Sequence, residues 1–240
     1  MHIRINDRTV TFPSSLAEFT LGQRIDFHSQ YGRQLDEMAK SILKMEDGPE
    51  KELETMHYSF EKIFRTFGFF AGVDPEVLKE SDFVDDIANI YHANLATLFE
   101  DEQNIELQQE FVWNGETWQL HAPELKHGSK MKFGEFIDSK QLIKDMIDLG
   151  NGKWDYMLPL CVIFLRKKGE NYQEEFLYEG SDRLQLMRSL PMNIALAIGF
   201  FLTSSVNIYL STLQSSSLPG QKAAASIALS IMPAGDGSIS

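Results

Sequence analysis

The residue types that most often carry out chemistry are few in this 240-residue chain, and they are not grouped. Six histidines are spread from His2 to His127, and no two of them have the spacing of metal ligands on one helix. Asp85 and Asp86 are adjacent, so on a helix their carboxylates point about 100° apart and do not converge. The single cysteine, Cys161, lies in an apolar run, where a small buried residue is the expected role. The sequence therefore predicts no metal site, no cofactor and no catalytic residue.

The motifs of common catalytic and nucleotide-binding sites are missing as well. No glycine-rich phosphate loop follows a predicted strand, and the chain has no Gly-x-Ser-x-Gly nucleophile turn. We therefore expect a protein that is not an enzyme and that works through its surfaces. The alternative is an enzyme with a small-ligand site at the junction of two repeated halves of the chain.

The net charge of -13 comes from the middle of the chain. Residues 46–110 carry 17 acidic and 4 basic side chains, whereas the segments before and after them are close to neutral. Such an acidic block repels a phosphate backbone, which argues against nucleic-acid binding. It suits either a solvated set of helix surfaces or a basic protein partner. With one cysteine and no signal-peptide pattern at the N-terminus, we expect a reducing, cytoplasmic setting.

One order of elements occurs twice in the sequence. Residues 3–27 read as a short strand pair that turns at Asn6-Asp7, followed by a helix that opens at Thr20. Residues 110–139 repeat this order, with a hairpin at Asn114-Gly115 before the next helix. Asn-Gly is the strongest two-residue hairpin signal, because both central residues must accept a positive φ. The pattern predicts two repeated units, each a small β-hairpin followed by helices.

The fold class follows from these two units. We predict an α+β protein that is mainly α-helical. The predicted division is an N-terminal unit with acidic helices at residues 1–108, a second unit at 109–214, and a tail at 215–240. The tail is rich in Ser, Ala and Gly, so it is expected to be flexible or to become ordered on a partner.

Apolar periodicity predicts the helices of the first unit. Ser14 or Ser15 is the expected cap of the first helix, and a second helix follows the Asp47-Gly48-Pro49 break. Asp74-Pro75 restarts the chain, and Ser81 is expected to cap a further helix. The apolar residues of the last two long helices recur at steps of three and four and are expected to face the core. They are Leu53, Met56, Phe60, Ile63, Phe64, Phe67 and Phe70 in one helix and Phe83, Ile87, Ile90, Tyr91, Leu95 and Leu98 in the other.

The second unit is expected to contain helices over residues 133–149, 154–165 and 181–189, with an extended piece near 172–178. Pro191 then ends or restarts a helix. No charged side chain occurs between Arg188 and Lys222, which raises the question of a membrane span. The densest apolar run, residues 194–202, is about half the roughly 20 residues that a span needs. We therefore predict a buried central helix and no membrane association.

Three segments resemble those of small phage proteins known as tail assembly chaperones, of the type found in Bacteroidetes phages. They are Thr20-Leu21-Gly22-Gln23-Arg24-Ile25-Asp26-Phe27, Phe133-Gly134-Glu135-Phe136-Ile137-Asp138, and the Leu-Pro helix at residues 186–202. In that family a helix with an apolar-Gly-polar-apolar-Ile-Asp opening follows a hairpin, and a Leu-Pro helix with an Ile-Ala-Leu run closes the domain. The resemblance covers residues 110–213, and residues 1–45 through the internal repeat.

The resemblance implies a non-enzymatic assembly factor of the host cytoplasm. Such a chaperone binds a long, helical tape-measure protein and keeps it soluble while the tail tube polymerises. A structural virion protein of the neck, tail or internal cargo is the alternative, and a homo-oligomer also remains open. Protein-binding residues are expected among Trp113, Trp118, Phe200 and Phe201, although packing of the two tryptophans against the helices and burial of Phe200 and Phe201 are the alternatives.

Overall fold

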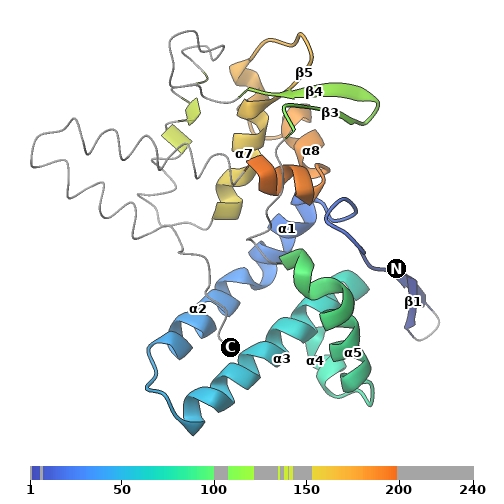
Figure 1. Ribbon diagram of the computed structural model, residues 1–240, viewed down its shortest axis with the longest axis vertical. Coiled ribbons are helices and arrows are strands. Elements are labelled where there is room, and N and C mark those ends of the chain that lie inside the picture. The colour runs from blue at the N-terminus through green and yellow to red at the C-terminus, as the bar shows by residue number, and fades with distance from the viewer. Residues whose placement is uncertain are drawn as a thin grey trace, which may run out of the picture. The chain divides into compact units, whose positions relative to one another are not determined.

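The computed structural model describes residues 2–5, 8–99, 108–121, 135, 138–139, 141–142 and 153–198. The chain divides into two compact units, residues 1–100 and 101–240. As the sequence predicts, the protein is mainly helical with small antiparallel sheets (Figure 1). None of the helices in the described ranges combines the length and apolar character needed to cross a membrane.

The first unit opens with a hairpin of β1 (His2–Ile5) and β2 (Arg8–Thr11), whose last pair joins Ile5 to Arg8. The predicted turn at Asn6-Asp7 lies outside the described residues. The first helix, α1 (Leu21–Phe27), is capped by Thr20 and not by Ser14 or Ser15. The Thr20 hydroxyl accepts from the Gln23 backbone, and the Gln23 side chain accepts from the Thr20 backbone. Ser14 instead donates to Glu18.

One π-helical turn, His28–Gly32, joins α1 to α2 (Arg33–Leu43). A Cβ at Gly32 would lie 2.1 Å from Nδ1 of His28, so a larger residue there would require the His28 ring to move. The long helix α3 (Pro49–Ala71) then runs back and ends at Gly72, whose φ of 63° is left-handed. In Figure 1, α2 and α3 form a helical hairpin, and the shorter α4 (Pro75–Lys79) and α5 (Val84–Ile90) lie against α3.

From α3 to α5, the predictions at Pro49 and Asp74 are correct, and those at Ser81 and Phe83 are wrong. Asp74 caps α4 with Pro75 in its first turn, and Pro49 begins α3 after the predicted break. Ser81 caps no helix, because its hydroxyl donates backward to the Leu78 carbonyl and Phe83 precedes α5. Phe83 is 65% exposed and does not face the core. A π-helical turn (Tyr91–Leu95) and a 3₁₀ turn (Ala96–Phe99) follow α5 and bury Tyr91, Leu95 and Leu98.

The core of the first unit is a cluster of phenylalanine rings. Phe27 contacts Phe99 with ring centroids 4.7 Å apart, and Phe12 contacts Phe67 at 4.9 Å. Phe70 joins both parts of the cluster through contacts with Phe12 and Phe99. Most of these pairs are edge-on or tilted, which is the preferred geometry of aromatic rings in protein cores.

The second unit contains a three-stranded antiparallel sheet of order β3-β4-β5. Strands β3 (Glu110–Trp113) and β4 (Glu116–Leu120) form the predicted hairpin, with φ values of 51° at Asn114 and 75° at Gly115. Strand β5 (Leu165–Lys167) was not predicted. It follows directly after α7 (Lys153–Phe164), because Leu165 pairs with Leu120 of β4 instead of continuing the helix.

The end of the described chain is helical. A 3₁₀ turn (Glu174–Leu177) stands where an extended piece was predicted, so that prediction is wrong. Helix α8 (Asp182–Arg188) is capped by Ser181, and residues 192–198 form a new helix after Pro191.

Cys161 is buried in α7, as expected, and burial raises the pKa of its thiol. Most of the predicted helix over residues 133–149 and the whole tail lie outside the described residues, so the repeat remains a prediction.

Candidate protein-binding surface

The N-terminal half of α3 carries large apolar side chains that face solvent. Leu53, Met56 and Phe60, here called the α3 stripe, are 58%, 53% and 40% exposed. Steps of three and four residues place them on one face of the helix. The apolar periodicity of the sequence predicts that this face is buried along its whole length, and for these three residues that prediction is wrong.

The same face of α3 becomes part of the core one turn further on. Ile63, Phe64 and Phe67 are 5%, 5% and 3% exposed. The difference is one of coverage. Helix α3 has 23 residues and spans about 35 Å, and α2, α4 and α5 pack against it, but α4 and α5 have only 5 and 7 residues and span roughly 10 Å each. Short helices cover only part of a long one, and the α3 stripe projects beyond the packed half.

Acidic side chains surround the α3 stripe. Residues 46–60 contain five carboxylates and one lysine, Lys51, which is paired with Asp47 at 2.7 Å. On a helical wheel, Glu52 lies on one side of the stripe and Glu50 on the other. Both glutamates are exposed. An apolar strip between acidic borders is suited to a partner helix with apolar and basic side chains.

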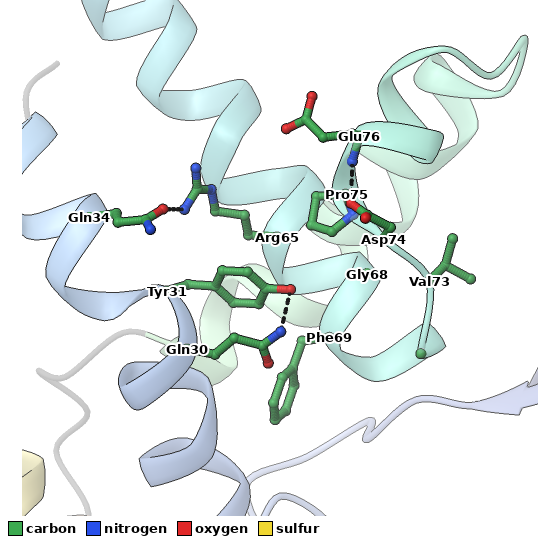
Figure 2. A pocket seen from close by; sticks show the side chains of 11 residues that line it. Gln30, Tyr31, Gln34, Arg65, Gly68, Phe69, Val73, Asp74, Pro75 and Glu76 are labelled. Atoms are coloured by element: carbon green, nitrogen blue, oxygen red, sulfur yellow. Dashed lines mark hydrogen bonds between the residues drawn. The ribbon is translucent and has the colours of Figure 1, made fainter.

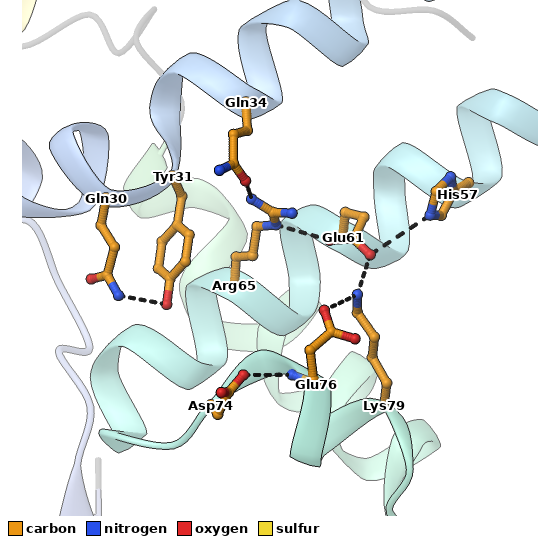
Figure 3. Close-up of polar contacts among 9 residues, drawn as sticks. All are labelled: Gln30, Tyr31, Gln34, His57, Glu61, Arg65, Asp74, Glu76 and Lys79. Carbon is orange, nitrogen blue, oxygen red and sulfur yellow. Dashed lines mark hydrogen bonds and ion pairs between the residues drawn. The ribbon is translucent and has the colours of Figure 1, made fainter.

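A polar network marks the boundary between the exposed and the packed half of α3 (Figure 3). Glu61 is 5% exposed, accepts from Nε of Arg65 at 2.8 Å and also bonds Lys79 of α4. Nε2 of His57 lies 3.6 Å from the same carboxylate. Burial by itself raises the Glu61 pKa, but the bonds and charges of Lys79 and Arg65 outweigh burial and lower it. The network fixes α4 to α3 at this point.

A cleft of about 580 Å³ lies beside this network (Figure 2). The π-helical turn supplies Tyr31, α3 supplies Arg65, and the start of α4 supplies Asp74. Burial, followed by the charge of Asp74, raises the Tyr31 pKa, so the phenol is neutral at physiological pH. Arg65 is already held by Glu61 and by Gln34. None of the residues lining the cleft has a buried side-chain polar atom without a partner.

The predicted contact residues Trp113 and Trp118 lie inside the second unit. They are 8% and 1% exposed, their ring centroids are 5.0 Å apart, and Nε1 of Trp118 donates to the Trp113 carbonyl at 3.1 Å. The guanidinium of Arg183 lies between the rings of Trp118 and Phe176, 4.9 and 4.5 Å from their centroids. The two tryptophans are therefore packed inside the unit, which is the alternative to their predicted role as exposed contact residues. Phe200 and Phe201 lie outside the described residues.

The second unit contains a buried polar cluster that was not predicted from the sequence. Arg166 of β5 is paired with Glu135 at 2.7 Å, and both side chains are at most 4% exposed. The Tyr172 hydroxyl donates to Asp138. Burial is the main cause that raises the pKa of Tyr172, and the hydrogen bond to Asp138 raises it further. Glu135 and Asp138 belong to the Phe-Gly-Glu-Phe-Ile-Asp segment, so its acidic residues serve internal contacts. The available signal was a glutamate between two phenylalanines, Phe133 and Phe136.

Comparison of the chain with protein-family models, with curated proteins and with solved structures finds no match. Within the part of the chain that the structure describes, no three His, Cys, Asp or Glu side chains are grouped to hold a metal ion.

Proposed function

We propose that this chain is a non-enzymatic assembly factor that holds a helical segment of another protein against the α3 stripe. In its specific form, the proposal is a phage tail assembly chaperone of the host cytoplasm that holds a tape-measure-type protein. The observation that carries it is the solvent exposure of Leu53, Met56 and Phe60 at helical spacing within an acidic border.

A holding chaperone has two physical requirements, and the first unit offers both. It must present apolar surface to a partner whose own apolar faces are exposed, and it must keep the pair in solution. The α3 stripe supplies the apolar surface. The acidic excess of residues 46–110 supplies the charge that opposes aggregation.

The phage assignment rests on the sequence resemblance. Its supporting residues are the two Gly-containing helix openings at Gly22 and Gly134 and the Leu-Pro helix after Arg188. In the structure, the first opening is a capped helix start at Thr20, and the Leu-Pro junction precedes the helix at residues 192–198. These placements agree with the helix starts that the resemblance implies.

Co-expression tests the holding activity directly. A tape-measure-type protein is produced with the full chain or with the variant L53S/M56S/F60S, and its soluble fraction is measured. We expect the native chain to raise that fraction and the variant to lose the effect. The variant Y178S removes a similarly exposed ring, at 56%, from the second unit and is the control. Equal solubility with the native chain and the triple variant would rule out the α3 stripe as the holding surface.

Mass spectrometry of purified virions and infected-cell lysate separates the chaperone from its alternative. A transient chaperone is abundant in the lysate and absent from particles. A fixed copy number per particle would instead identify a structural virion protein.

A further inference from the structure

We infer that the occupant of the α3 stripe is an amphipathic helix whose apolar face is bordered by Lys or Arg. This inference rests on the proposed function and adds the chemistry of the partner. It follows from the size of the stripe, from the charges beside it and from the location of the ion pairs on α3.

The size and spacing of the stripe fit a helix. Leu53 and Phe60 are seven residues apart, which corresponds to about 10.5 Å or two helical turns. A helix laid along this face presents its own apolar side chains at matching steps of three, four and seven residues. Helix α3 has no β-strand edge to offer, so pairing with an extended peptide through backbone hydrogen bonds has no support here.

The charges beside the stripe are not neutralised by the chain itself. Glu50 and Glu52 are exposed and form no ion pair within the described part of the chain. Glu61, at the far end of the stripe, is already matched by Arg65 and Lys79. The unpaired negative charge is therefore concentrated next to Leu53 and Met56, where basic side chains of a partner would lie.

A second copy of this chain is a poor occupant. Two copies that pair symmetrically through this stripe carry the same acidic border, Glu50, Glu52 and Glu54, so neither copy offers the other a basic border. Like charges placed together across an interface are unfavourable. A basic amphipathic helix has the same apolar complementarity and an attractive charge pattern instead.

Two designed helical peptides test the inference with the full chain. Both carry leucines at a spacing that matches the stripe, and their bordering positions are all Lys in one peptide and all Glu in the other. Binding is followed by fluorescence anisotropy of a dye on the peptide. We expect the Lys peptide to bind at least about tenfold more tightly. That preference should shrink when NaCl is raised to about 1 M, where the Debye length is about 3 Å.

Two variants locate the contact on α3. In E50K/E52K, only exposed side chains change, and we expect the peptide preference to reverse. In L53S/M56S/F60S, both peptides should lose binding. Far-UV circular dichroism and the Tm of each variant confirm the fold.

Equal affinity of the native chain for the two peptides would overturn the basic-partner inference and leave the holding activity intact. An unchanged preference in E50K/E52K would also overturn it, because the charge selectivity would then reside elsewhere. The proposed holding activity is tested by a separate result. It is contradicted if L53S/M56S/F60S keeps the tape-measure-type protein as soluble as the native chain does.

Discussion

Phe60 and Phe64 stack on successive turns of α3 with ring centroids 6.2 Å apart, yet Phe60 is 40% exposed and Phe64 only 5%. The exposed and the buried part of one apolar face therefore meet between these two rings. A face that is sequestered at one end and open at the other can stabilise the fold and still contact a partner.

Alanine substitution of the two rings should separate these roles. Phe64→Ala removes a core side chain and is expected to lower the free energy of unfolding by about 3–5 kcal/mol. Phe60→Ala removes a partly solvated ring and should cost less than about 1.5 kcal/mol while weakening partner binding. Urea denaturation measures both free energies. An equal loss of stability in the two variants would contradict the exposure of Phe60.

Glu61 should make the stability of the first unit depend on acid pH. Its pKa is lower in the folded chain than in the unfolded chain, so its contribution is fully present above the unfolded value and is lost as pH falls through the folded value. At neutral pH, Glu61→Gln is expected to cost about 1.5–3 kcal/mol, because charged hydrogen bonds to Lys79 and Arg65 are lost.

The difference in the free energy of unfolding between the native chain and Glu61→Gln, measured by urea denaturation, should decrease as the pH is lowered from 7 toward strongly acidic values. The control is Glu50→Gln, an exposed glutamate without an ion pair in the described part of the chain. It lies in the first turn of α3, so its loss should cost less than about 1 kcal/mol. If this difference in the free energy of unfolding does not change with pH, the charge of Glu61 does not contribute to stability.

The buried pair of Arg166 and Glu135 should show strong coupling. Arg166→Met leaves the Glu135 carboxylate buried without its cation, at a cost of about 3–5 kcal/mol. The double variant R166M/E135L removes both charges and should recover most of this loss. Lys167→Met breaks a half-exposed pair with Glu116 and should cost less than about 1 kcal/mol. If the effects of Arg166→Met and Glu135→Leu on the free energy of unfolding are additive in the double-mutant cycle, the two side chains do not interact as a pair.

Gly68 permits a close approach of the backbone at the end of α3. A Cβ at this position would lie 2.6 Å from the Val73 carbonyl oxygen, and backbone atoms cannot move aside as a flexible side chain can. Gly68→Ala is therefore expected to lower stability by about 1–3 kcal/mol. Gly48→Ala is the matched control, because nothing lies within 4 Å of its added methyl group. A Tm scan compares the two, and similar values would contradict the close approach.

Substitution of Trp118 is expected to destabilise the fold, and any loss of partner binding would follow from that. Its ring is 1% exposed and packs against Trp113 and Arg183, so Trp118→Ala is expected to cost about 3–5 kcal/mol. Val112→Ala, on the same hairpin and 75% exposed, is the control. Near-UV circular dichroism follows the loss of packing, and retained packing with lost partner binding would support the predicted contact role of Trp118.

Local signals in the sequence were enough where the structure depends on one or two residues. Asn114-Gly115 predicts its hairpin because both residues accept a positive φ, and Asp74-Pro75 predicts a helix start because the fixed φ of proline suits the first helical turn. Predictions failed where two signals competed. Thr20 caps the first helix although Ser15 also has an acidic residue, Glu18, three positions later. Glu18 accepts from Ser14 instead, whereas Gln23 completes a reciprocal cap with Thr20.

The sequence by itself determined the helix-rich composition, the hairpin turn at Asn114-Gly115, the acidic middle segment and the apolar periodicity of α3. Only the tertiary structure decided which part of that periodic face is covered, because coverage depends on the lengths and positions of α4 and α5. It also decided that Leu165 leaves α7 to pair with β4, and that Arg166 meets Glu135. These outcomes depend on contacts between residues far apart in the chain, and periodicity within a single segment carries no information about such contacts.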